Sequence, residues 1–289
     1  MKFVSNYKDN QTLRESFMQL ALQVFGIDFK PWYEKGCWND RYIPYSYTDG
    51  DKIVANVSIN IMDLILDGER RKALQIGTVM THPEYRNNGL SKKLMNLVLE
   101  QYETEYEIIY LMANKDVLDF YPKFGFKPVR ETQFTIKCCI QNPSIAGVRK
   151  LDPESEEDFK IIERLVLQRS SISKVLGVEN CEAIQLFYAL VGIPDCYYYV
   201  KEADVILVYH EENGIIHLYD IISKEKIDFH RLISKIPAEN VRQIIFEFTP
   251  DLLEINTSTS PLDSEDTFFV RSSLSFDNKE FKYPKTAMA

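Results

Sequence analysis

The segment QIGTVMTHPEYRNNGLSKKLMNLVLE, residues 75–100, predicts a buried strand, a short loop and the start of a helix. The apolar, β-rich run 76–80 ends just before Pro83, which restricts the backbone of the residue that precedes it. Apolar residues between 90 and 98 then recur at the spacing of one helix face. The chain around this segment is therefore expected to contain a strand, a loop and a helix in succession.

The loop of this segment, residues 84–89, has a composition that suits an anion. Gly89 can adopt a positive φ and lets the backbone approach a ligand closely. The amides from Asn88 to Ser91 would lie at a helix N-terminus, where unpaired N–H groups and the helix dipole favour phosphate. An ordinary crossover turn with a glycine would look the same. Positive charge is added nearby by Arg86, Lys92 and Lys93.

Two spacings give this segment a family resemblance. The pattern Arg86-x-x-Gly89-x-Ser91 resembles the pyrophosphate loop of the GCN5-related N-acetyltransferases (GNAT family), in which the last position is Gly or Ala. Asn114, seven residues before Tyr121 and followed by Gly125-Phe126, resembles the second signature of that family. The form FYPKFGF is most similar to acetyltransferases of the enhanced-intracellular-survival type, which carry two such folds in tandem and a third, sterol-carrier-like domain. The match covers residues 1–143.

The resemblance implies an α/β (α+β) protein with two tandem GNAT-like acyl-CoA N-acyltransferase folds. Each is a mixed, mostly antiparallel sheet flanked by helices. Residues 144–289 repeat the order of helices, hairpin, strand, helix and strand, after a polar cluster at 141–144. We therefore expect an acetyltransferase domain with a CoA-binding loop in residues 1–143. A degenerate domain should follow in residues 144–289, because its turn 223–228 has no glycine and carries acidic residues.

Two further expectations concern the ends of these domains. Residues 126–129 and 134–140 are predicted to form the closing hairpin of the first domain. The tail, residues 277–289, is polar and carries no clear prediction.

The family pattern also implies roles for particular residues. Acetyl-CoA would be the co-substrate, its pantetheine arm pairing with the strand edge at 79–81 and its pyrophosphate bound by the loop. Tyr121 is the expected general acid, because a phenol with a pKa of about 10 stays protonated at neutral pH and can protonate a leaving thiolate. The alternative is that Tyr121 is only packed. The expected coenzyme-binding residues are Val79, Met80, Thr81, Arg86, Asn87, Asn88, Gly89, Leu90, Ser91 and Asn114.

The general base and the acceptor stay open. Glu34, Asp40 and Asp63 lie near the expected acceptor region. Survival-type enzymes place the terminal carboxylate of their chain in the site, which makes Ala289 a further candidate. The aromatic stretch 31–47 is either core packing or the wall of a substrate pocket. The acceptor is expected to be a primary amine of a small molecule or peptide, with aminoglycoside, polyamine, amino acid and protein lysine all open.

Charge and composition exclude several other classes. The net charge of −9 comes from residues 144–289, with 16 Lys and Arg against 25 Asp and Glu, whereas residues 1–143 carry 18 of each. Nucleic-acid binding favours the opposite sign, which also disfavours a nucleic-acid-modifying acetyltransferase. No stretch of about 20 apolar residues predicts a membrane span, and the first residues show no secretory leader.

The cysteines and histidines predict neither a disulfide framework nor a metal site. There are five Cys, an odd number without a CxxC pair, and four scattered His. A cytoplasmic location is expected on this basis. The sequence leaves open whether the chain forms a homo-oligomer. The alternative to an enzyme is a non-catalytic acyl-CoA-binding or scaffolding protein built on the duplicated fold.

Overall fold

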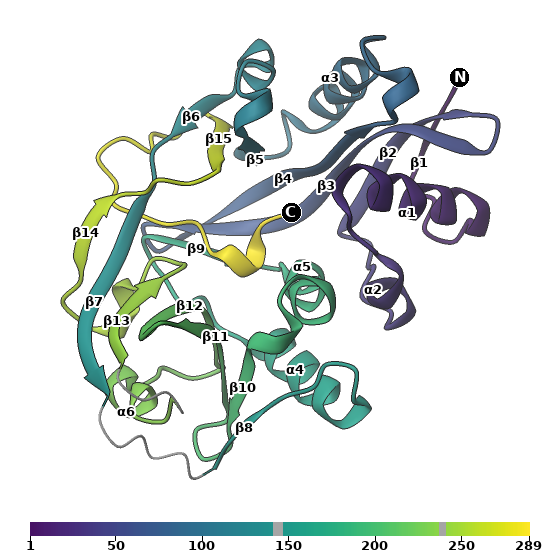
Figure 1. The fold of residues 1–289 in the computed structure, drawn as a ribbon. Helices are drawn as coiled ribbons and strands as arrows, with labels where there is room; N and C mark the ends of the chain where they lie inside the picture. The colour runs from purple at the N-terminus through teal and green to yellow at the C-terminus, as the bar shows by residue number, and fades with distance from the viewer. Residues whose placement is uncertain (141–146, 237–240) are drawn as a thin grey trace.

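The fold is built around a long hairpin of β3 (Lys52–Leu66) and β4 (Glu69–Thr81), shown in Figure 1. Its turn uses Asp67 and Gly68, both with positive φ (54° and 81°), as a tight two-residue hairpin turn requires. Apolar residues at 53, 55, 57, 59 and 61 alternate along β3, which is the pattern of a strand. The structure is a computed structural model and describes residues 1–140, 147–236 and 241–289.

The first sheet surrounds this hairpin. Its strand order is β1-β2-β3-β4-β5-β15-β6, and a short strand β9 pairs with the far end of β3. All described pairs are antiparallel except β4 with β5, which run parallel. The remaining strands are β1 (Lys2–Ser5), β2 (Tyr42–Asp49), β5 (Ile108–Asn114), β6 (Lys127–Val129), β9 (Leu176–Glu179) and β15 (Asp266–Ser272).

The second sheet repeats much of this plan. Its order is β14-β7-β13-β12-β11-β10-β8, in which the antiparallel pair β11–β12 is followed by a parallel pair β12–β13. The fold class predicted from the sequence is confirmed: two mixed, mostly antiparallel sheets flanked by helices. The strands are β7 (Thr132–Ile140), β8 (Val148–Lys150), β10 (Tyr197–Val200), β11 (Val205–Glu212), β12 (Ile215–Ile222), β13 (Val241–Phe246) and β14 (Ser258–Pro261).

Each sheet contains a strand from the other half of the chain. β15 lies next to β5 in the first sheet, and β7 takes the corresponding place next to β13 in the second. The predicted hairpin of residues 126–129 and 134–140 is therefore wrong: β6 pairs with β15, and β7 pairs with β13 and β14. The polar cluster at 141–144 lies outside the described residues. The division at residue 143 stays a prediction, and strands from both sides of it complete each sheet.

Helices cover both faces of the first sheet. α1 begins after Asn10, whose Oδ1 accepts the Leu13 N–H at 3.1 Å, and ends at Gly26 in the left-handed conformation. None of the helices in the described part of the chain is long and apolar enough to span a bilayer. The helices are α1 (Gln11–Phe25), α2 (Lys30–Glu34), α3 (Leu90–Tyr102), α4 (Glu156–Gln168), α5 (Glu182–Phe187) and α6 (Phe229–Ile233).

The halves of the chain share a hydrophobic core. α3 packs its apolar stripe on one face of the first sheet. On the other face, Phe17 and Trp32 belong to the same buried cluster as Phe159 and Tyr197 from the second half. Trp32 Nε1 donates to the carbonyl oxygen of Ala183 at 2.7 Å, which links α2 directly to α5. Separating the halves would therefore expose apolar surface on both.

The tail, residues 277–289, is partly buried although its sequence is polar. Phe281 and Tyr283 are buried, and Figure 1 shows the C-terminal turn between the two sheets. The Tyr283 hydroxyl lies 2.8 Å from that of Tyr110 and donates to the Ala287 carbonyl at 2.9 Å. Lys282 pairs with Glu247 of the second sheet at 2.6 Å. The tail therefore ties the two sheets together.

Candidate active site

A cleft opens where β4 and β5 separate. Their parallel pairing runs from Ala73 and Ile108 to Ile76 and Leu111, and no further. Beyond it, β4 remains paired to β3, and β5 to β15, so each strand presents an edge to the gap. The cleft has a volume of about 610 Å³, within the range of ligand sites.

A bulge in β4 shapes the middle of this cleft. Gly77 pairs with Ser58 and Met80 with Asn56, so two residues of β4 face one of β3. Thr78 has a positive φ of 48°, unusual for a branched residue. Its carbonyl oxygen accepts from Asn56 Nδ2 at 2.8 Å, and its Oγ1 lies 3.0 Å from the Tyr42 hydroxyl. These partly buried contacts hold a strained backbone in place at the cleft, as is typical of functional sites.

The loop before α3 provides unpaired amides at one end of the cleft. Asn87 and Gly89 have positive φ (64° and 72°), and Gly89 is the residue before α3. In the described part of the chain, the backbone N–H groups of residues 87–92 donate to no acceptor. The Ser91 hydroxyl is held 2.7 Å from that of Thr81. The geometry is that of an anion site at a helix N-terminus.

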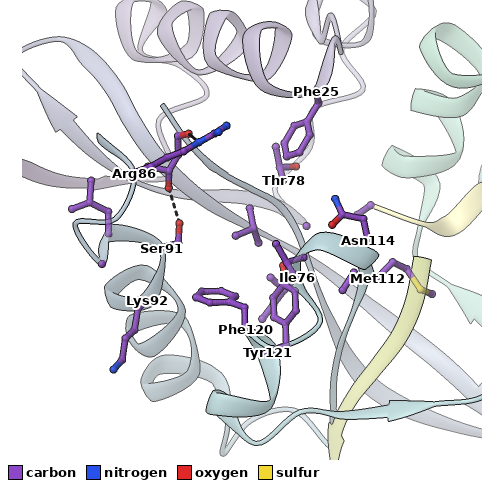
Figure 2. Close-up of a pocket in the computed structure, with 18 of the residues that line it drawn as sticks. Phe25, Ile76, Thr78, Arg86, Ser91, Lys92, Met112, Asn114, Phe120 and Tyr121 are labelled. Atoms are coloured by element: carbon purple, nitrogen blue, oxygen red, sulfur yellow. Dashed lines mark hydrogen bonds between the residues drawn. The ribbon is translucent and has the colours of Figure 1, made fainter. Parts of the chain in front are cut away.

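Most of the predicted coenzyme residues line this cleft, as Figure 2 shows with Arg86, Ser91 and Lys92 at one end and Thr78, Asn114 and Tyr121 towards the other. Two do not. The Met80 side chain is buried in the core behind β4, and Asn88 Nδ2 donates to the Tyr85 carbonyl within the loop. The predicted residues that line the cleft are Val79, Thr81, Arg86, Asn87, Gly89, Leu90, Ser91, Asn114 and Tyr121.

Tyr121 lies at the inner end of the cleft. Its side chain is only 5% exposed, and its ring packs against Phe120 and Phe269, with centroids 5.2 and 5.9 Å away. Burial raises its pKa to about 12. Among the described residues, none forms a hydrogen bond with its hydroxyl, and burial is the sole cause of the pKa shift. The phenol is therefore protonated at neutral pH and available to a ligand.

Three of the four candidate bases from the sequence lie outside this cleft, whereas the fourth, Ala289, lines it. Asp40 forms an ion pair with Lys8, Asp63 accepts from Asn180 Nδ2 at 2.6 Å, and Glu34 is exposed on α2. Of the described residues that line the cleft, Asp266 is the one with an acidic side chain. Sequence reasoning missed it because it opens β15, and local patterns do not reveal that this late strand pairs with β5.

A second cavity adjoins the cleft. It has a volume of about 230 Å³ and shares Phe25, Thr78 and Ala289 with the cleft. Trp32 and Tyr42, from the aromatic stretch 31–47, line it. The stretch thus forms part of a cavity wall as well as part of the core.

The corresponding position in the second sheet is filled by the protein itself. The pairing of β12 with β13 ends at Leu218 and Phe246, as β4 and β5 separate in the first sheet. Asp220, just beyond, binds Arg169 at 2.6 and 2.9 Å and accepts from Thr286 of the tail at 2.6 Å. The turn after β12 leads to the short α6, where the Asp228 carboxylate accepts the Arg231 N–H at 3.1 Å. An acidic side chain therefore occupies the place of an anion.

Comparison with known families identifies the first part of the chain. Residues 10–129 match the model of the acetyltransferase (GNAT) domain. The chain therefore contains a GNAT acetyltransferase domain in its first part. The matched range includes the cleft from β4 to Tyr121, so the resemblance seen in the two signatures is confirmed. No curated protein matches the sequence significantly.

Solved structures share the fold of nearly the whole chain. A probable N-acyltransferase from Enterococcus faecalis has a TM-score of 0.59 at 15% identity, covering 94% of this chain and 72% of that one. Eis1 from Mycobacterium abscessus has a TM-score of 0.57 at 12% sequence identity, and the match covers 94% of this chain and 73% of Eis1. An acetyltransferase from Pyrococcus horikoshii, described as putative, has a TM-score of 0.51 at 13% sequence identity, and the match covers 99% of this chain and 96% of that one. At these identities the likeness is one of fold, and it extends the GNAT-type architecture into the second half.

Proposed function

We propose that the chain is an N-acyltransferase that transfers an acetyl group from acetyl-CoA to a primary amine of a small molecule or peptide. The observation that carries the proposal is the arrangement of the cleft. Unpaired amides of residues 87–92 lie at one end, and the free hydroxyl of Tyr121 lies at the other. The family of residues 10–129 supports acyl transfer in general.

The protein would bind the coenzyme along the cleft. The loop amides and Arg86 bind the pyrophosphate, since N–H groups at a helix N-terminus favour phosphate. The unpaired edge of β4 from Gly77 to Thr81 hydrogen-bonds the pantetheine arm as an added strand would. An N–H of the bulge, at Thr78 or Val79, faces the thioester carbonyl and stabilises the negative charge that develops on its oxygen.

Two side chains would move the protons of the reaction. As the amine nitrogen bonds to the carbonyl carbon and the carbon–sulfur bond breaks, one proton leaves the nitrogen and one is needed by the sulfur. Tyr121 donates its hydroxyl proton to the departing sulfur. Asp266, which pairs in register with Asn114 of β5, accepts the proton of the amine, directly or through water. Proton exchange with solvent restores both groups.

Calorimetry and a thiol-release assay test the proposal. Titration of the full chain with acetyl-CoA should show one site, and amines should accelerate thiol release. Binding without release, on any amine, would instead favour the non-catalytic acyl-CoA-binding protein. Absence of binding would overturn the assignment of the cleft. Propionyl-CoA and longer thioesters, compared in the same assay, decide the preference for acetyl.

A further inference from the structure

The cavity next to the cleft is built for an uncharged, apolar group. Among the residues that the structure describes, no charged side chain lines it, and Ala289, whose terminal carboxylate is a candidate base, lies where the cavity meets the cleft. Its walls are Ile27, Phe29, Trp32 and Tyr42 on one side and Ile184, Phe187 and Tyr188 on the other. Burying a second ammonium there without a counter-charge would be costly. The excess acid of the second half therefore does not extend into this cavity.

The shape of this cavity is fixed by packing between the two halves. Phe29 lies against Trp32 and Phe187, with ring centroids 5.8 and 5.3 Å away, and Trp32 meets Tyr42 edge-on at 5.4 Å. The hydrogen bond from Trp32 to the Ala183 carbonyl fixes α2 against α5. At about 230 Å³, the cavity is smaller than the ~300–1,000 Å³ typical of drug-sized ligands. It can hold a single ring or a branched aliphatic group.

One buried donor inside this cavity has no partner. Asn60 is 3% exposed, lines the cavity, and its Nδ2 makes no hydrogen bond to the described residues. A buried donor without an acceptor costs about 1–3 kcal/mol, which a ligand oxygen would recover. Gln75, opposite Asn60 on β4, also has an unpartnered Oε1. Alternatively, the side-chain amides of Asn60 and Gln75 rotate and form a hydrogen bond with each other. The experiment must distinguish this from binding of a ligand oxygen by Asn60.

The charged group of an amine ligand would lie where the cavity meets the cleft. Thr78 and Ala289 border both spaces, and Asp266 lines the cleft. Burial and, after it, the charge of Asp266 raise the pKa of Tyr188, so this carboxylate lies within electrostatic reach of the cavity wall. An amine at the junction would face an acid, while its body would extend away from charge.

From this geometry we propose that the acceptor is a monoamine with an aromatic or branched apolar body and an uncharged oxygen that accepts from Asn60. The inference rests on the proposed acyl transfer and specifies its acceptor. It disfavours aminoglycosides and polyamines, which carry several positive charges. It also disfavours a long acyl chain as the occupant, because a hydrocarbon offers Asn60 no acceptor.

The experiment compares five amines in the thiol-release assay. They are phenylalaninamide, tyramine, 2-phenylethylamine, spermine and kanamycin. The aromatic amines should exceed spermine and kanamycin in kcat/KM by about tenfold or more, and an oxygen-bearing one should exceed 2-phenylethylamine by about fivefold or more. Asn60→Leu should abolish the second preference and keep turnover of 2-phenylethylamine. Preference for the polycations, or oxygen-independent turnover in the wild type, overturns the inference.

Two further measurements keep this test separate from the proposed function. Trp32 lines the cavity, so tryptophan fluorescence reports occupancy without turnover. A fluorescence response to aromatic amines without thiol release leaves the cavity assignment standing and refutes acyl transfer. Ile27→Phe should fill the cavity and lower kcat/KM for aromatic amines, whereas Leu22→Phe, on the exposed face of α1, should not. Equal effects of both substitutions would contradict the assignment.

Discussion

Ala289 lies directly against Gly77 of β4. A Cβ placed on Gly77 would come 2.8 Å from Ala289 Cβ and 3.1 Å from its carbonyl carbon. Gly77 is also where β4 has just separated from β5. The tail therefore reaches the cleft at the point where the two cavities meet, and its position depends on the absence of a side chain there.

Gly77→Ala should displace the end of the tail. Overpacking of this kind typically costs about 1–3 kcal/mol, which thermal unfolding can measure. Deletion of Met288 and Ala289 removes the contact, so the same substitution in the shortened chain should cost almost nothing. An equal cost in both backgrounds would show that Gly77 is required for another reason.

Tyr121→Phe should lower kcat by about 10²-fold or more at pH 7 and leave acetyl-CoA affinity unchanged. The ring stays packed against Phe120 and Phe269, so only the proton is lost. Because the Tyr121 pKa is raised to about 12, the wild-type acid stays protonated over the assay range. The leaving thiolate, with a pKa of about 8.5 by analogy with cysteine, needs no proton at higher pH. The penalty should therefore shrink between pH 7 and pH 9.5, and a constant penalty would argue against the acid role.

The sequence predicts the local elements of the site well. The strand at 52–66, the helix at 11–25 and the loop around Gly89 are determined by alternation, helix periodicity and turn residues, all of which act within a few positions. The two signature motifs also indicate which residues between β4 and Tyr121 are brought together at the cleft. These features are local, so a single sequence suffices to predict them.

The partners of strands and the path of the tail are not local. Residues 266–272 form a strand, but nothing in their pattern indicates that they pair with β5 rather than with a neighbour in sequence. Asp266 was missed for that reason. The path of the tail could not be predicted because its polar residues mask Phe281 and Tyr283, which are buried in the folded protein. Contacts between the halves required the structure.

Gly89→Ala should weaken coenzyme binding by about tenfold or more. Alanine at a φ of +72° is strained by about 1–2 kcal/mol, and its methyl group would enter open space at the loop, where the phosphate is proposed to bind. Gly68→Ala is a matched control, because Gly68 has a φ of +81° and an equally open Cβ position far from the loop. Both variants should lose similar stability, and only Gly89→Ala should lose affinity by calorimetry. Similar affinities for the two would refute the phosphate site.

Asp266→Asn should lower kcat/KM for the amine by about 10²-fold or more while coenzyme affinity is kept. Amines with a pKa near 10 arrive already deprotonated at high pH, so the defect should diminish above pH 9. Asp266→Glu should restore part of the activity. Asp263→Asn, an exposed carboxylate on the approach to β15, is the control and should behave as the wild type. A pH-independent defect would indicate that Asp266 only supports the fold.

Glu131→Gln should flatten the dependence of stability on pH. Burial raises the Glu131 pKa to about 7, although the Tyr283 N–H, Lys282 and Lys285 act to lower it. The folded state therefore binds more protons than the unfolded state between pH 4.5 and 7, so stability falls as pH rises through this window. Glutamine stays neutral and can still accept from the Tyr283 N–H, which lies 2.7 Å from Glu131 Oε1. The variant should melt higher than the wild type at pH 8, by about 2–4 °C for each kcal/mol relieved, and similarly at pH 4.5. Glu280→Gln, at an exposed site, should leave the wild-type pH dependence in place, and an unchanged slope in Glu131→Gln would place the titrating group elsewhere.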